Sequence, residues 1–151
     1  MATQIKVPEF EERWLDTINL DSVKIEVLCQ MGDYNQCNPN IRDCNFPAVI
    51  DGRRSEPSLI RFNRRMWSHE VVKCLEEKHY RLATARELLR LGIMLRDRPC
   101  NKFIVALSDS AVLGRKHWVV CLGLQPMWRE CGLRKLTTLW TAKTQFLVFK
   151  I

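Results

Sequence analysis

The sequence predicts an α+β fold in a single domain, residues 1–151, in which helices in the first two-thirds of the chain precede an antiparallel sheet. Three observations lead to this prediction. The chain has 151 residues, the size of one ordinary domain. Helical and alternating hydrophobic patterns occupy separate parts of the chain, which is typical of α+β proteins. No repeat, low-complexity tract or Pro/Ser-rich linker divides the sequence.

Three elements are predicted before residue 58. Residues 9–18 carry apolar side chains at helical spacing behind Pro8 and predict a short amphipathic helix. Residues 23–27 alternate between apolar and charged side chains, which predicts a half-buried strand. Gly, Asp, Asn and Pro dominate residues 32–57 and predict a long loop, whose centre at Phe46–Ile50 is compatible with a short strand.

Residues 58–151 are predicted to form a basic helix-helix-sheet core. Ser58–Phe62 is a candidate strand, and Ser68 has the chemistry to cap a helix that runs to about Lys78. A second helix begins at Thr84, where Glu87 completes a capping box.

Gly92 is expected to end that second helix. The apolar run Phe103–Leu107 predicts a central strand covered on both faces. Three further strands are predicted over 118–124, 133–139 and 146–151, which gives an antiparallel sheet in the C-terminal half.

Charge is distributed unevenly along the chain. The formal net charge is +7, but residues 1–52 hold four Lys/Arg against nine Asp/Glu, whereas residues 53–151 hold 20 against eight. A field of this sign attracts polyanions, so the basic part favours an acidic protein surface or nucleic acid as partner, although solvation of an ordinary surface explains it equally well.

Composition excludes several classes of protein. No apolar run is long enough to span a bilayer, and acidic residues near the N-terminus argue against a secretory signal, so we expect no membrane association. The seven cysteines are an odd number and cannot all pair within the chain, which favours free thiols in a reducing, cytoplasmic compartment.

Motifs for catalysis or cofactor binding are missing. His69, His79 and His117 lie in no metal-hydrolase or nucleophile motif, and the isolated glycines form no phosphate-binding loop. These absences favour a protein without enzymatic activity and without a cofactor, while an active site assembled from scattered residues stays open.

Cys29, Cys37 and Cys44 are the only cysteines whose spacing suggests zinc ligands. Structural zinc sites usually bring ligands in close sequence pairs, and no such pair exists here. We therefore expect no metal site.

The densest basic cluster is the candidate partner-binding site. It consists of Arg53, Arg54, Arg61, Arg64 and Arg65. Phe62 and Trp67 are interleaved with it and offer rings for bases to stack on, unless both are buried.

The leading hypothesis is a non-enzymatic binding module that engages an acidic macromolecule, a protein ahead of nucleic acid, through this basic surface. The alternative is a nucleic-acid-binding accessory protein of a mobile element.

Residues 62–151 carry a recognisable order of features. A helix follows Trp67, the strand 103–108 comes later, and a closing Trp140 precedes Phe146, Leu147 and Val148; the most specific part is the set Tyr80, Arg81, Ala83, Thr84, Glu87, Leu88 and Leu89. This order resembles a family of small uncharacterised proteins of candidate-phylum bacteria. It is also similar, at the level of the fold, to C-type lectin-like domains. The chain lacks the paired disulfides and the calcium motif of those domains, so the resemblance does not imply calcium-dependent sugar binding.

Overall fold

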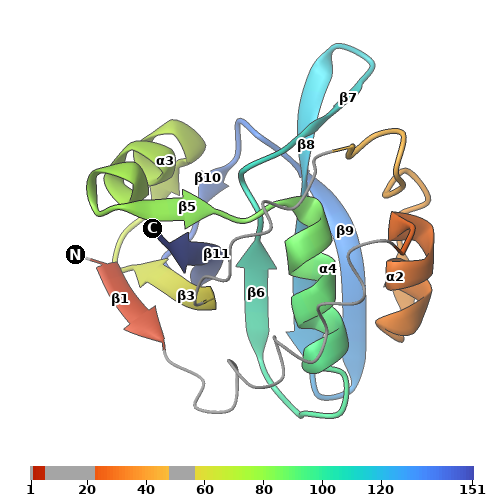
Figure 1. Ribbon diagram of the computed structural model, residues 1–151. Helices are drawn as coiled ribbons and strands as arrows, with labels where there is room; N and C mark the ends of the chain where they lie inside the picture. The colour runs from red at the N-terminus through yellow and green to blue at the C-terminus, as the bar shows by residue number, and fades with distance from the viewer. Residues whose placement is uncertain (1, 6–22, 48–56) are drawn as a thin grey trace.

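The computed structural model describes residues 2–5, 23–47 and 57–151 (Figure 1). The helices in this part of the chain are α2 (Ile25–Met31), α3 (Ser68–Glu77) and α4 (Ala85–Met94). The strands are β1 (Ala2–Ile5), β2 (Gln36–Cys37), β3 (Pro57–Phe62), β4 (Met66–Trp67), β5 (Tyr80–Leu82), β6 (Lys102–Val105), β7 (Ala111–Leu113), β8 (Lys116–Gln125), β9 (Trp128–Lys135), β10 (Leu139–Trp140) and β11 (Thr144–Lys150).

A nine-stranded mixed sheet dominates the molecule. Its main order is β1-β3-β11-β6-β8-β9-β2, with β5 paired to β11 and β7 paired to β8. The pairs β11–β6 and β2–β9 are parallel, and the others in this sheet are antiparallel. A small second sheet joins β10 to β4.

The predicted order of helices followed by an antiparallel sheet is therefore wrong. Strands β1 to β5 lie before and between the helices, and the sheet is mixed rather than antiparallel. Short strands such as β2 and β5 were missed because two or three residues are too few to show an alternating pattern.

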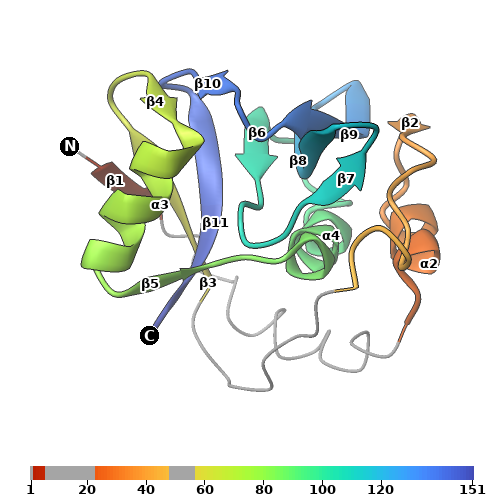
Figure 2. The same ribbon diagram turned by 90° about the horizontal axis from the view of Figure 1, so that it is seen from above.

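Two hydrophobic cores lie on opposite faces of the sheet. In β6, Ile104 packs in the first core with α2 and α4, whereas its neighbour Val105 packs in the second core with α3. Leu147 and Val148 divide in the same way on β11, because successive side chains of a strand point to opposite faces. Figure 2 shows α2 and α4 side by side along one side of the sheet.

Residues 23–27 enter a helix and not the predicted strand. Ile25, Leu28 and Cys29 are buried at helical spacing, and Val27 is exposed. The Asp43 carboxylate accepts a hydrogen bond from the Ile25 N–H, which satisfies a donor in the first turn of α2. This helix therefore depends on a side chain supplied by a distant loop, which a local pattern cannot show.

The start of α3 also differs from the prediction. Ser68 is the first helical residue and Trp67 is the N-cap. The Ser68 hydroxyl donates to the carbonyl of Leu136 and accepts from the Trp140 indole N–H, so it joins α3 to the small sheet. At the N-cap, the Trp67 N–H donates to the carboxylate of Glu70 instead.

The beginning of α4 confirms the predicted capping box. The Thr84 hydroxyl accepts from the Glu87 N–H at 3.2 Å, and the Glu87 carboxylate accepts from the Thr84 N–H at 3.0 Å. The predicted end at Gly92 is wrong, because α4 continues to Met94. Gly92 is needed inside the helix because a Cβ atom there would collide with the Tyr34 hydroxyl.

Four of the predicted strands are found in place. Those over 58–62, 103–107, 118–124 and 146–151 correspond to β3, β6, β8 and β11. The strand predicted over 133–139 is wrong in its bounds, because β9 begins at Trp128 and contains Gly132, which faces Cys121 on β8.

The segment predicted as a long loop contains β2. Residues 36–37 pair with β9, and Phe46 is buried but lies in no strand. The predicted helix over 9–18 and the loop residues 48–56 lie outside the described part of the chain.

Arg129 on β9 ties both helices of the first core to the sheet. Its guanidinium donates to the carbonyls of Gly32, Gly92 and Leu95, at 3.1, 2.8 and 3.2 Å. These carbonyls belong to the C-terminal ends of α2 and α4, where backbone acceptors lack helical partners and a cation is favourable. We call this arrangement the carbonyl clamp.

The described helices are all too short and too polar to cross a membrane.

Removing the Thr84 hydroxyl should destabilise the protein. In Thr84→Ala the Glu87 N–H loses its acceptor, and we expect a loss of about 1 kcal/mol in the free energy of unfolding, measured by urea denaturation. Thr137→Ala, at an exposed threonine, is the control and should leave stability unchanged. Equal stability of the two variants would contradict a stabilising role for the capping box.

Removing the charge at position 129 should have a larger effect. Arg129→Gln leaves helix-end carbonyls without a charged donor, and we expect a loss of about 3 kcal/mol in the free energy of unfolding. Arg115→Gln, at the exposed β7–β8 turn, removes the same charge and should change stability little. A loss of similar size in both variants would show that charge, and not the carbonyl clamp, is responsible.

Candidate functional site

A basic pocket lies where four strand ends meet at one edge of the sheet. It has a volume of about 370 Å³. Its polar wall consists of Arg61, Asn101, Lys102, Gln125, Lys143 and Gln145. Arg61 is near the end of β3 and opposite Gln145 on β11, and Lys102 begins β6. Antiparallel pairing of β3 with β11 and parallel pairing of β11 with β6 thus bring cations from distant parts of the chain to one place.

No acidic side chain lines this pocket among the described residues. Arg61 and Lys143 are exposed, and Lys102 is half-buried. Gln145 is only 6% exposed, and its Oε1 atom has no hydrogen-bond partner in the described part of the chain. The pocket therefore offers three cations and one buried acceptor to a ligand.

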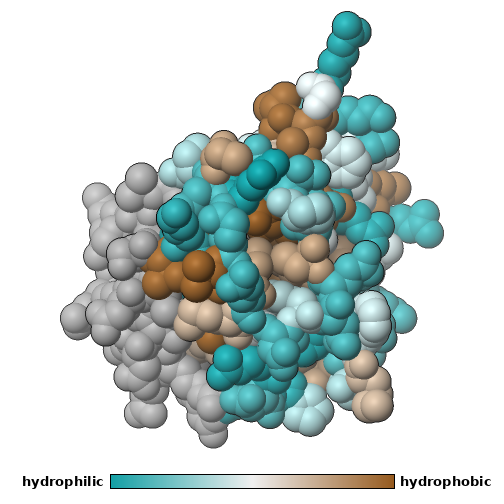
Figure 3. Space-filling view, turned by 90° about the vertical axis from the view of Figure 1, so that its right-hand side faces the viewer, coloured by the Kyte–Doolittle hydropathy of each residue, from teal (hydrophilic) through white to brown (hydrophobic). Residues whose placement is uncertain are grey.

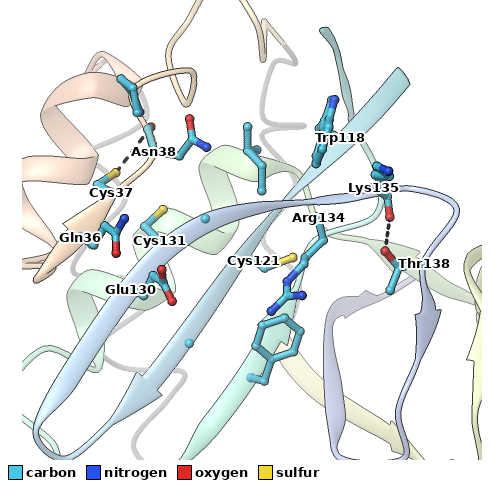
Figure 4. A pocket seen from close by; sticks show the side chains of 15 residues that line it. Gln36, Cys37, Asn38, Trp118, Cys121, Glu130, Cys131, Arg134, Lys135 and Thr138 are labelled. Atoms are coloured by element: carbon cyan, nitrogen blue, oxygen red, sulfur yellow. Dashed lines mark hydrogen bonds between the residues drawn. The ribbon is translucent and has the colours of Figure 1, made fainter. Parts of the chain in front are cut away.

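A second, adjoining pocket lies on the open part of the β8–β9 surface. This β8–β9 pocket has a volume of about 570 Å³ and shares Phe103 and Gly123 with the basic pocket. Figure 4 shows Cys37 and Cys131 at one end of it, and Trp118, Arg134 and Lys135 at the other. Glu130 is the acidic residue in its lining.

The aromatic rings of the β8–β9 pocket are covered by cations. The Arg134 guanidinium carbon lies 5.5 Å from the centroid of the Phe103 ring, and the Lys135 Nζ lies 5.9 Å from that of Trp118. Such cation–π contacts occupy the faces on which a nucleic-acid base would stack.

The five arginines predicted as the partner-binding site are only partly brought together. Arg61 lines the basic pocket, whereas Arg64 is 3.7 Å from the Glu70 carboxylate at the start of α3. Arg65 is exposed in the turn between β3 and β4. Arg53 and Arg54 lie outside the described residues.

The two interleaved aromatic residues differ in exposure. Phe62 is buried, with its ring 6.1 Å from that of Phe146, and so offers no stacking face to a partner. Trp67 is 44% exposed. Lys102 and Lys143 were missed as site residues because each is isolated in the sequence, and only strand pairing places them beside Arg61.

Three cysteines form a compact thiol cluster at the sheet edge. Cys29 lies on α2, Cys37 on β2 and Cys131 on β9, and their sulfur atoms all lie within 4.8 Å of one another. Cys37 and Cys131 face each other directly in the parallel β2–β9 pair. Sequence spacing proposed Cys44 as the third member, but Cys44 is exposed and Cys131 takes that position.

Hydrogen bonding within the thiol cluster separates the pKa values of its members. Hydrogen bonds from Cys131 and Cys29 lower the pKa of Cys37 to about 4. The hydrogen bonds to Cys29 and Cys37, together with burial, hold the pKa of Cys131 well above its ordinary value. Cys37 is therefore the ionised member near neutral pH, and Cys131 is protonated. All seven cysteines of the protein are unpaired.

One serine–histidine contact occurs outside these pockets. The Ser110 Oγ lies 3.4 Å from Nδ1 of His117, and both side chains are at the base of the β7–β8 hairpin. No carboxylate hydrogen-bonded to His117 is found in the described part of the chain. The contact therefore lacks the third group that orients the base in a nucleophile triad.

The side of the molecule that carries α2 is largely hydrophilic, with smaller hydrophobic patches between the polar side chains (Figure 3).

Comparisons with protein-family models, with curated proteins and with solved structures found no match to the chain.

The low pKa of Cys37 predicts an unusual pH dependence of alkylation. A thiol with an ordinary pKa of about 8.5 gains reactivity roughly tenfold per pH unit between pH 5 and 8, because its thiolate fraction rises. Cys37 is already a thiolate above its pKa of about 4, so its rate with iodoacetamide should stay nearly constant over this range.

The rate is to be measured by peptide mass spectrometry on reduced protein in the presence of a chelator. A cysteine-containing unstructured peptide serves as the reference. A tenfold rise per pH unit at Cys37 would contradict the hydrogen-bonded thiolate.

Proposed function

We propose that this protein is a binding module without enzymatic activity, and that it engages an acidic segment of a partner protein through the basic pocket. The observation that carries the proposal is the meeting of Arg61, Lys102 and Lys143 around one pocket that no described acidic residue lines. Carboxylates of a partner would be attracted by this field and would form charge-assisted hydrogen bonds with the three cations.

Two features favour a protein over nucleic acid as the partner. The rings of Phe103 and Trp118 each carry a cation, Arg134 or Lys135, over one face, so a base that stacked on that face would have to displace it. The unpartnered Oε1 of Gln145 needs a hydrogen-bond donor, and leaving such a buried acceptor unpaired costs about 1–3 kcal/mol. A polypeptide supplies backbone N–H donors beside its carboxylates, whereas phosphate groups only accept, and a nucleic acid would have to donate from a base or a ribose hydroxyl.

The proposal places the protein in the cytoplasm. Its seven unpaired cysteines, three of them with sulfur atoms within 4.8 Å of one another, are compatible with a reducing compartment. The Ser110–His117 contact gives no support to hydrolytic chemistry, because the described residues supply no carboxylate to orient the histidine.

Binding of acidic probes tests this proposal. We expect fluorescently labelled oligoglutamate to bind and to lose affinity as salt is raised, in fluorescence anisotropy experiments. The variant Arg61→Gln/Lys102→Gln/Lys143→Gln should bind about tenfold more weakly or worse, since it loses three charged contacts. Its far-ultraviolet circular dichroism should match that of the wild type, because none of the three side chains is fully buried.

The matched control is Lys78→Gln/Arg115→Gln/Lys150→Gln, which removes the same net charge at exposed positions outside the pocket. It should retain most of the affinity. Equal losses of affinity in the two triple variants would show that net charge, and not the basic pocket, accounts for binding. Tighter binding of a single-stranded oligonucleotide than of oligoglutamate, at the same salt concentration, would favour the nucleic-acid alternative.

A further inference from the structure

The thiol cluster has the donor set of a metal site. Sulfur from α2, β2 and β9 converges to within 4.8 Å, and the thiols are not joined by disulfides. Thiolates select soft or borderline metal ions such as zinc and copper(I) over magnesium or calcium. Another buried cysteine, Cys121 on β8 in the second core, belongs to no such group among the described residues.

We propose that Cys29, Cys37 and Cys131 bind a single zinc ion through their three sulfur atoms, with the fourth coordination position left to water. This site is separate from the basic pocket and does not depend on the function proposed above.

The distances suit a tetrahedral zinc ion. A zinc–sulfur bond of about 2.3 Å in tetrahedral geometry requires sulfur–sulfur separations of about 3.8 Å. The three sulfur atoms already lie within 4.8 Å of one another, so each pair has to close by about 1 Å or less. Rotation of side chains about their Cα–Cβ bonds can supply such a movement without a change in the fold.

The backbone around the cluster is held in place before any metal binds. The Asn38 N–H donates to the carbonyl of Cys131 at 2.9 Å, and the Asn35 N–H donates to the carbonyl of Arg129 at 2.8 Å, which fixes β2 against β9. The carbonyl clamp holds the C-terminal end of α2, one turn beyond Cys29. A preorganised donor set needs little ordering on binding, which favours affinity.

The cluster borders the β8–β9 pocket. Cys37 and Cys131 line the end of the β8–β9 pocket, and Figure 4 shows both side chains at that end. Zinc sites with three protein ligands keep a fourth position for water or for an exogenous group. Cys37 is only half-buried, so the cluster is not wholly closed to solvent.

Charge favours zinc over copper(I). Three thiolates leave one residual negative charge on a zinc complex and two on a copper(I) complex. Burying the larger charge is more costly, and Cys29 and Cys131 are both buried.

Metal titration of the full chain tests the proposal. Reduced, metal-free protein is titrated with zinc against a chromophoric chelator, and cobalt(II) is added separately as a spectroscopic probe. We expect one zinc per chain, a rise in Tm on zinc addition, and cobalt spectra with sulfur charge-transfer bands and the visible bands of tetrahedral coordination. Cys37→Ser and Cys131→Ser should weaken zinc binding about 100-fold or more.

Cys44→Ser and Cys121→Ser are the matched controls, because one removes an exposed thiol from the same loop and the other a buried thiol from the neighbouring strand. Both should bind zinc like the wild type. Because Cys37 is only half-buried, Cys37→Ser keeps the test decisive if Cys131→Ser fails to fold. Three results would overturn the proposal: no stoichiometric zinc, undiminished binding by Cys37→Ser, or binding of copper(I) without zinc.

Discussion

The carbonyl clamp of Arg129 is the interaction on which the rest of this structure most depends. One guanidinium reaches the C-terminal ends of two helices from a strand of the sheet. Its carbon atom also lies 5.3 Å from the centroid of the Tyr34 ring. Helix ends leave carbonyls without partners, and a planar group with several donors satisfies them while neutralising the helix dipoles. The clamp thereby sets the distance between α2 and β9, across which Cys29 meets Cys131.

The mixed sheet explains where the two candidate sites lie. Its middle strands are covered on both faces, as the buried side chains of β11 show, so their polar groups are accessible mainly at strand ends. The basic pocket forms at such an edge. The thiol cluster forms at the lateral edge, where the two-residue strand β2 adds to β9. Both sites therefore occupy places where the regular sheet stops.

The two sites differ in electrostatic character. The basic pocket gathers cations with no acidic counterpart in its described lining, which suits a ligand of opposite charge. In the thiol cluster, hydrogen bonds from Cys131 and Cys29, rather than a cation, lower the pKa of Cys37. The β8–β9 pocket borders both sites. It shares Phe103 and Gly123 with the basic pocket, and Cys37 and Cys131 of the thiol cluster are also in its lining.

The sequence by itself determined the elements whose signals are local. The Thr84–Glu87 capping box fixes the start of α4, and the apolar runs fix β3, β6, β8 and β11, because both signals arise within a few residues of chain.

Only the tertiary structure decided the rest. The Asp43 carboxylate accepts a hydrogen bond from the first turn of the helix over 25–31. The Tyr34 hydroxyl occupies the space that a Cβ atom at Gly92 would need. Strand pairing brings Cys131, and not Cys44, into the thiol cluster. Each of these outcomes depends on a contact between residues far apart in the chain, and local periodicity carries no information about such contacts.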